Sequence, residues 1–80
     1  MSRARDVVEV VARALADRPD AVRVTERQEK GQTVVELSMA PGDLGRVIGR
    51  QGRTAAAIRT LVTLAAELDG TKATVDFRDE

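Results

Sequence analysis

The sequence contains no cysteine, histidine, tryptophan or tyrosine, and Phe77 is its only aromatic residue. Without cysteine the chain forms no disulfide, and it lacks thiolate and imidazole groups, the commonest nucleophiles, general bases and zinc ligands. The carboxylates are scattered and show no metal-binding pattern. A nucleic-acid site built on stacked aromatic side chains is excluded as well. We therefore expect no enzyme activity, no metal site, no cofactor and no small-molecule substrate.

Long apolar runs are also missing. No stretch approaches the ~20 apolar residues that a membrane span requires, and residues 1–6 lack the apolar segment of a secretory signal. A length of 80 residues, of which 42% are hydrophobic and 32% charged, fits one folded domain over residues 1–80. We expect a cytoplasmic protein that does not contact membranes.

Charge is balanced overall but unevenly distributed. The chain has 13 basic and 13 acidic residues, yet residues 44–66 contain four arginines and no acid. The rest of the chain is therefore net acidic. A local positive patch can hold an anion while the acidic remainder limits nonspecific association. The alternative is that these arginines only solvate a helix face.

Apolar periodicity predicts six elements. Helices are expected over residues 3–17, from 44 to about 48, and over 53–68, and strands over 21–28, 32–40 and 72–78. Gly31 supplies the positive φ of a tight hairpin turn, Ser2 and Asp43 are predicted helix caps, and Gly70 is predicted to end the long helix. The expected inward positions of the outer helices are Ala4, Val7, Val8, Val11, Ala12 and Leu15, and Thr54, Ile58, Leu61, Val62, Ala65 and Leu68.

The order helix, strand, strand, helix, helix, strand predicts an α+β fold. The hairpin makes the first two strands antiparallel, and the two-helix crossover brings the last strand back parallel to the second. We expect a three-stranded mixed sheet with the second strand in the centre, covered on one face by three helices.

The most informative motif runs from Gly45 to Thr54 and contains Gly49-Arg50-Gln51-Gly52. Its glycine spacing fits neither a P-loop nor a dinucleotide fingerprint. What remains is Gly-x-x-Gly between two helices, which is by itself a weak signal and is common in ordinary helix–helix turns.

This motif has a physical logic as a site for a sugar-phosphate backbone. Glycines permit a sharp bend and a close approach, and the next helix begins at once with free N–H groups and a positive dipole end. Arg50 and Arg53 add fixed charges beside that end. Apolar side chains such as Ile48 can line a groove for bases. The predicted contact residues are Arg46, Ile48, Gly49, Arg50, Gln51, Gly52, Arg53 and Arg59.

The string from Asp43 to Ala55, the following Ile58 to Leu61 and the element order resemble a type II, bacterial KH domain of the small, single-domain KhpA family. The resemblance extends over the whole chain. It implies that residues 49–52 clamp about four nucleotides of single-stranded RNA, with Arg46, Arg53 and Arg59 as neighbouring backbone contacts. It also implies an RNA chaperone or post-transcriptional regulator that forms a homodimer, pairs with a KhpB-like KH protein, and serves cell shape and peptidoglycan homeostasis.

Two departures from the family bear on RNA affinity. Relatives often have a lysine where Ala56 stands, and many KH domains have a larger apolar residue at the position of Ala55, so the base groove is expected to be shallow. The alternative function is a protein-interaction module with little RNA binding of its own. Val10 and Leu64, at the edges of the two long helical stripes, are candidates for a self-association surface.

Overall fold

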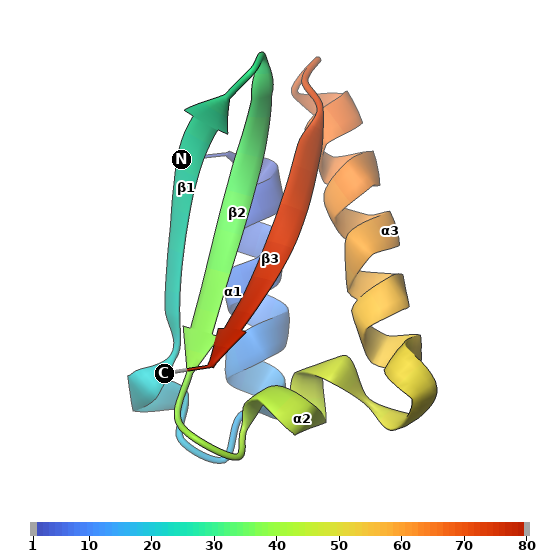
Figure 1. Ribbon diagram of the computed structural model, residues 1–80. Helices are drawn as coiled ribbons and strands as arrows, with labels where there is room; N and C mark the ends of the chain where they lie inside the picture. The colour runs from blue at the N-terminus through green and yellow to red at the C-terminus, as the bar shows by residue number, and fades with distance from the viewer. Residues whose placement is uncertain (1, 80) are drawn as a thin grey trace.

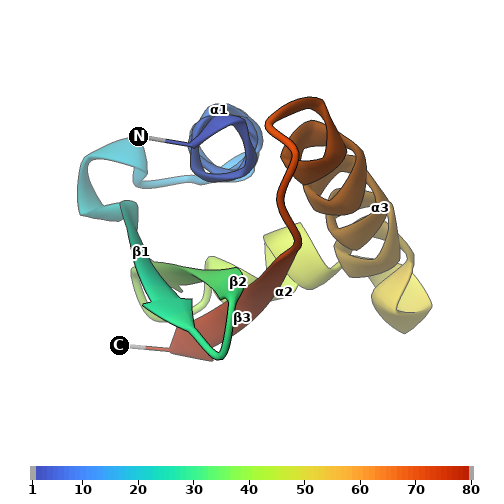
Figure 2. The same cartoon turned by 90° about the horizontal axis from the view of Figure 1, so that it is seen from above.

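A three-stranded sheet forms one layer of the structure, and three α-helices cover one of its faces (Figures 1 and 2). The structure is a computed structural model and describes residues 2–79. In chain order the elements are α1 (Arg3–Leu15), β1 (Arg23–Glu29), β2 (Gln32–Met39), α2 (Leu44–Ile48), α3 (Arg53–Leu68) and β3 (Ala73–Asp79), with 3₁₀ turns at Pro19–Ala21 and Arg50–Gly52. The predicted α+β fold and element order are confirmed. No helix in the described part of the chain is long and apolar enough to cross a membrane.

The strand order is β1-β2-β3, with β1 antiparallel and β3 parallel to the central β2, as predicted. The hairpin turns at Lys30 and Gly31, whose φ angles of 51° and 80° give the left-handed pair of a tight reversal. The register turns Val35, Leu37 and Met39 toward the helices, and each is 0% exposed. Because side chains alternate along a strand, the opposite face of the sheet carries mainly charged and polar side chains.

The inner face of α3 differs from the prediction in two positions. Leu61 and Leu68, predicted to point inward, are 45% and 73% exposed, whereas Ala55 and Ala66 are buried. The stripe that packs against the sheet and α1 is formed by Ala55, Ile58, Val62, Ala65 and Ala66. Small alanine side chains let α3 approach its neighbours closely, so the bulkier leucines fall on the outer side of the helix.

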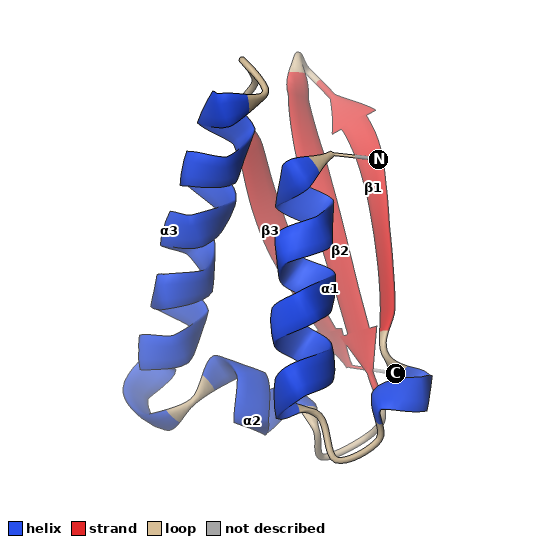
Figure 3. Cartoon of the chain, turned by 180° about the vertical axis from the view of Figure 1, so that it is seen from behind, coloured by secondary structure: helices blue, strands red, loops and turns tan. Residues whose placement is uncertain are grey.

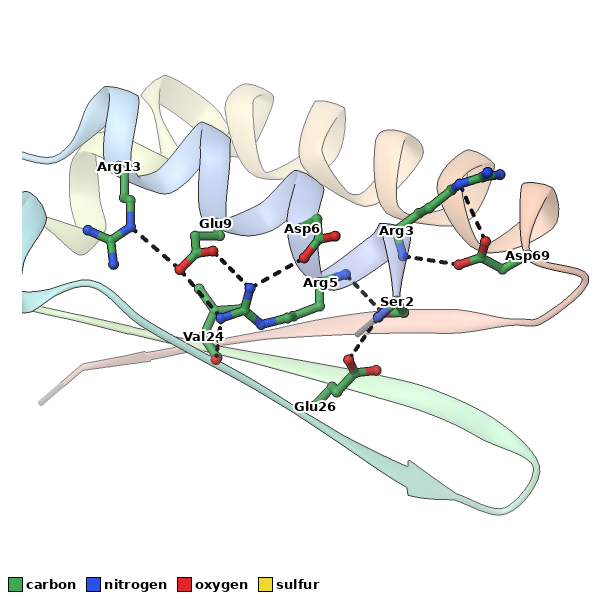
Figure 4. A network of polar contacts seen from close by, with 9 residues as sticks. All are labelled: Ser2, Arg3, Arg5, Asp6, Glu9, Arg13, Val24, Glu26 and Asp69. Carbon is green, nitrogen blue, oxygen red and sulfur yellow. Dashed lines mark hydrogen bonds and ion pairs between the residues drawn. The ribbon is translucent and has the colours of Figure 1, made fainter.

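Polar contacts fix the start of α1 against β1 (Figure 4). Ser2 is the predicted N-cap: its Oγ accepts a hydrogen bond from the Arg5 N–H at 3.1 Å, and its own N–H donates to Oε1 of Glu26 at 3.0 Å. The Arg5 guanidinium lies under the helix and donates to Glu9 at 2.8 Å and to the Val24 carbonyl at 3.4 Å. The hydrogen bond to Glu9 raises the pKa of Arg5, and the same bond lowers the pKa of Glu9.

The prediction that the Asp43 side chain caps α2 is wrong. Asp43 precedes α2, but its backbone is already helical (φ −81°, ψ −26°), and its side chain makes no capping hydrogen bond. Its carboxylate is buried and accepts a hydrogen bond from the Arg18 N–H at 2.9 Å. Asp43 therefore ties the α1–β1 connection to the start of α2, a link between segments far apart in the sequence.

Candidate nucleic-acid interface

The Gly-x-x-Gly segment forms a tight surface turn between α2 and α3. Gly49 ends α2, with its N–H donating to the Gly45 carbonyl at 2.9 Å, and Gly52 donates to the Gly49 carbonyl at 3.2 Å. Three of the four residues have positive φ: Gly49 (75°), Gln51 (57°) and Gly52 (71°). Both glycines are half-buried, while Arg50 and Gln51 are exposed. The turn thus presents its backbone to the outside.

Gly49 is required by both its conformation and its surroundings. Its φ of 75° and ψ of 173° lie in a region that is essentially restricted to glycine. A Cβ atom at this position would overlap Oγ1 of Thr54 and lie 2.8 Å from the Thr54 Cβ. At Gly52, by contrast, an added Cβ would meet nothing within 4 Å. The first glycine lets the turn fold back against α3, and the second leaves its outer surface open.

The α3 N-terminus lies directly behind this turn. Gly52 is the N-cap residue, no side chain accepts a hydrogen bond there, and the first turn of α3 carries no acidic residue. The positive end of a 16-residue helix is therefore not neutralised by the described side chains. An anion that reaches the turn meets the positive end of the α3 dipole.

The predicted arginines differ in their surroundings. Arg46 is paired with acids, at 3.6 Å from Asp17 and 3.7 Å from Asp43. Arg53 donates to Oε1 of Gln51 at 3.1 Å, a bond that links the first residue of α3 to the exposed turn. Among the described side chains, Arg50 and Arg53 have no carboxylate within 4.0 Å. The structure therefore brings Arg50 and Arg53 together at the α3 N-terminus and turns Arg46 toward acidic neighbours.

Arg59 lies farther along α3 and faces β3. Its guanidinium carbon lies 5.1 Å from the centroid of the Phe77 ring, a cation–π distance. Beside it a cavity of about 140 Å³ lies between α3 and β3, lined by Arg59, Val62, Thr63, Ala73, Thr74 and Val75. Sequence reasoning did not connect Phe77 with Arg59. The only local signal was that the lone aromatic residue stands on the face of β3 that meets α3.

Ile48 is half-buried at the end of α2, next to the turn. Ala55 is buried in the first turn of α3 and adds little apolar surface beside it. The eight predicted contact residues thus separate into three groups: the turn itself with Arg50 and Arg53, Ile48 and Arg59 beside it, and Arg46, which is tied to acids. A polyanion that meets the turn also meets the guanidinium groups of Arg50 and Arg53, neither of which is paired with a described carboxylate.

Comparison with known proteins gives consistent matches over almost the entire chain. The profile of the family "KhpA/KhpB, KH domain" matches residues 5–77. A protein named "RNA-binding protein KhpA" from Aquifex aeolicus is 42% identical over 77 residues, which cover 96% of this chain and 98% of the relative. Proteins of the same name from Leifsonia xyli (49% over 70 residues, 88% and 90%) and Caldanaerobacter subterraneus (52% over 61 residues, 76% and 81%) are also similar.

Proposed function

Because this chain belongs to the KhpA/KhpB family of KH domains, we propose that it binds single-stranded RNA through its Gly-x-x-Gly turn. The observation that carries the proposal is the exposed turn at the N-terminus of α3, which has no acidic side chain in its first helical turn. The relatives that cover most of the chain are named RNA-binding proteins.

The mechanism follows from the chemistry of the turn. A phosphate group approaches the turn formed by residues 49–52, where the absence of a side chain on Gly52 permits close contact. The α3 dipole and N–H groups stabilise its negative charge. Arg50 and Arg53 add charge-assisted hydrogen bonds. Adjacent bases then lie toward Ile48 and the α3–β3 edge, where Arg59 offers a guanidinium plane for stacking.

The test replaces Arg50 and Gln51 by aspartate. Both side chains are exposed, so the variant is expected to keep its circular-dichroism spectrum and to lose RNA binding in fluorescence anisotropy. The matched control is Ala14→Asp/Arg23→Asp, which makes the same charge change at exposed positions on α1 and β1. An Arg50→Asp/Gln51→Asp protein that binds RNA as tightly as the native chain would refute the assignment of the turn.

Salt dependence gives a second measurement of the same proposal. A contact with about three phosphates on a single strand predicts that log K falls with log salt with a slope of roughly −2. Affinity in the micromolar range or weaker is expected, because few phosphates are contacted. A salt-independent interaction would contradict an electrostatic clamp.

A second candidate function, self-association, is favoured by exposed apolar side chains on α1 and α3, the two helices that form the outer side of the helical layer (Figure 3). Val10, Leu61 and Leu64 are 69%, 45% and 52% exposed. A shallow hollow of about 380 Å³ lies between the two long helices and is lined by Asp6, Val7, Val10, Val11 and Leu61. We propose that this surface pairs with a second copy of the chain, and that a KhpB-like KH protein competes for it.

Sedimentation velocity tests the self-association. Leu61→Glu is expected to convert a dimer to a monomer while RNA binding at the turn persists. Thr60→Glu, at the neighbouring exposed position on α3, is the control and is expected to leave the dimer intact. A native protein that is monomeric at all concentrations would refute the pairing. Loss of RNA binding together with loss of dimerisation would show that the two surfaces are not independent.

The wider roles implied by the resemblance remain proposals: an RNA chaperone or post-transcriptional regulator in the cytoplasm, with effects on cell shape and peptidoglycan homeostasis, and without enzyme activity. A strand-annealing assay with two complementary RNAs tests the chaperone role. Acceleration that disappears in Arg50→Asp/Gln51→Asp is the expected result. Annealing at the uncatalysed rate would exclude the role.

A further inference from the structure

A large, open hollow lies at the end of the molecule opposite the Gly-x-x-Gly turn. It is an open cavity of about 1000 Å³ between the β1–β2 hairpin, the C-terminus of α3 and the start of β3. Figure 1 shows these three segments together at the top of the view, while the turn between α2 and α3 lies at the bottom. Its lining residues are Lys30, Gly31, Gln32, Thr63, Glu67, Gly70, Thr71, Lys72 and Ala73.

Lysine distribution sets this cavity apart. The sequence has only two lysines, Lys30 and Lys72, and both line it. All other basic residues are arginines. Among the described side chains neither lysine has a carboxylate within 4.0 Å, and both are exposed. Two unpaired ammonium groups at one hollow attract an anion, and a lysine contacts phosphate as a point charge.

The backbone holds both lysines in place. Lys30 occupies the left-handed position of the hairpin turn, with φ of 51°. The carbonyl of Lys72 accepts a hydrogen bond from the Thr33 N–H at 2.8 Å, which anchors it to β2. The preceding α3 terminus is closed by bonds from Gly70 to Glu67 (3.0 Å) and from Thr71 to Ala66 (2.9 Å). The backbone around the cavity is therefore held by hydrogen bonds of the fold.

The acidic residues near the cavity do not cancel the lysines. Glu67 lines it and opposes an anion. Asp69, just beyond α3, is engaged elsewhere: Oδ2 accepts from the Arg3 N–H at 3.0 Å, and Oδ1 lies 3.5 Å from the Arg3 guanidinium (Figure 4). Two lysines facing one acid leave the hollow with a net positive charge.

This cavity adjoins the smaller cleft beside Arg59, because Thr63 and Ala73 line both hollows. The two hollows therefore follow each other along the α3–β3 edge. The 16 residues of α3 span roughly 24 Å between the turn and the lysines. Four stacked nucleotides extend over only roughly 14 Å. A strand clamped at the turn therefore reaches Lys30 and Lys72 only when it is longer than the clamped segment.

We propose that Lys30 and Lys72 form a second phosphate-binding site that holds the continuation of a single-stranded RNA along the α3–β3 edge. This inference rests on the proposed function of the turn and adds to it a length preference. RNA that occupies both sites makes two additional phosphate contacts, one with each lysine. RNA that occupies only the turn makes neither of them. Free phosphate, or a folded polyanion that places no single strand in the cleft, does not connect the two sites and is not expected to show this length preference.

The test compares RNAs of four and twelve nucleotides from random-sequence pools, measured by NMR titration and fluorescence anisotropy. For the twelve-nucleotide RNA, Lys30→Gln/Lys72→Gln is expected to weaken binding by roughly tenfold at 0.15 M salt and to reduce the salt slope by about 1.4. For the four-nucleotide RNA, no change is expected. Glu67→Gln is expected to tighten binding of the longer RNA only.

The control variant is Arg18→Gln/Arg23→Gln, which removes two exposed positive charges outside the cleft. Equal weakening by this control would overturn the proposal, because the effect would then reflect net charge alone. Unchanged binding of the longer RNA, or equal loss for both lengths, in the lysine variant would overturn it too. In those cases native binding of the four-nucleotide RNA leaves the function of the turn standing. If the native chain binds neither RNA length, both the lysine site and the proposed function of the turn are refuted.

Discussion

Replacing Gly49 by alanine tests the geometry on which the turn depends. The residue adopts φ 75° and ψ 173°, a conformation that costs a non-glycine residue on the order of 1–3 kcal/mol. The added Cβ would also collide with Thr54, at 2.8 Å from its Cβ and 3.2 Å from its backbone nitrogen. Overpacking of this kind costs roughly 1–3 kcal/mol. Together these effects predict a loss of about 3–4 kcal/mol of unfolding free energy.

Two other glycines of the same region provide graded controls. Gly52→Ala has a similar φ of 71° but no atom within 4 Å of the new Cβ, so only the conformational cost of about 1 kcal/mol is expected. Gly45→Ala lies within α2 with normal helical φ and open surroundings, and is expected to stabilise the protein by roughly 0.5–1 kcal/mol. The order of stability should be Gly45→Ala, native, Gly52→Ala, Gly49→Ala.

Thermal and urea unfolding followed by circular dichroism measure these differences. For a domain of this size, each kcal/mol shifts Tm by roughly 4–8 °C. Gly49→Ala should therefore melt at least about 12 °C below the native chain, and Gly45→Ala a few degrees above it. If Gly49→Ala and Gly52→Ala unfold at the same temperature, the collision with Thr54 does not exist and the account of the turn is wrong.

Three further predictions concern the framework around the turn. Because Arg5 lowers the pKa of Glu9 in the native state, their interaction stabilises the fold fully above the ordinary glutamate pKa. This stabilisation is lost as pH falls through the lowered pKa of Glu9. Glu9→Gln should therefore make the free energy of unfolding less dependent on pH in the acid range. An unchanged pH dependence would contradict the pairing. Asp43→Ala should lower the free energy of unfolding in urea by about 1–3 kcal/mol, because the Arg18 N–H loses its acceptor. Asp43→Asn keeps an acceptor oxygen and should therefore lose much less. Leu37→Ala, at a position 0% exposed in the central strand, should cost about 2–5 kcal/mol in the same measurement, and a cost below 1 kcal/mol would place the core elsewhere.

Local signals in the sequence predicted the elements well wherever the chain itself determines them. The bounds of α3 match the prediction because Gly52 begins it and Gly70 ends it. The prediction for α1 extended two residues too far, to residue 17, because Pro19 is the first residue beyond it that cannot continue a helix. In the structure the helix ends at Leu15, because the following residues extend so that Arg18 can donate to Asp43. That contact joins positions 25 residues apart and leaves no local trace in the sequence.

The same distinction holds for the candidate site. The glycine spacing indicated a sharp bend with arginines beside it, and the structure has that bend at the surface. The contacts of Arg46 with Asp17 and of Arg59 with Phe77 depend on how distant elements pack, so periodicity did not reveal them. Leu61 was assigned to the core because hydrophobicity alone does not distinguish an inward leucine from one on an outer helix surface.

The zero formal charge of the chain hides a separation that arises from where the acids lie. Outside residues 44–66, five of the seven arginines lie within 4.0 Å of a carboxylate; Arg5, for example, contacts Glu9, and Arg27 lies 2.7 Å from Glu36. Within residues 44–66 there is no acid, so Arg50 and Arg53 can be neutralised only by a residue from another element, and among the described side chains none is within reach. Pairing elsewhere thus leaves the positive charge at the turn uncompensated. A neutral chain can therefore offer a localised anion site, and we expect its affinity for RNA to depend on these few residues rather than on overall charge.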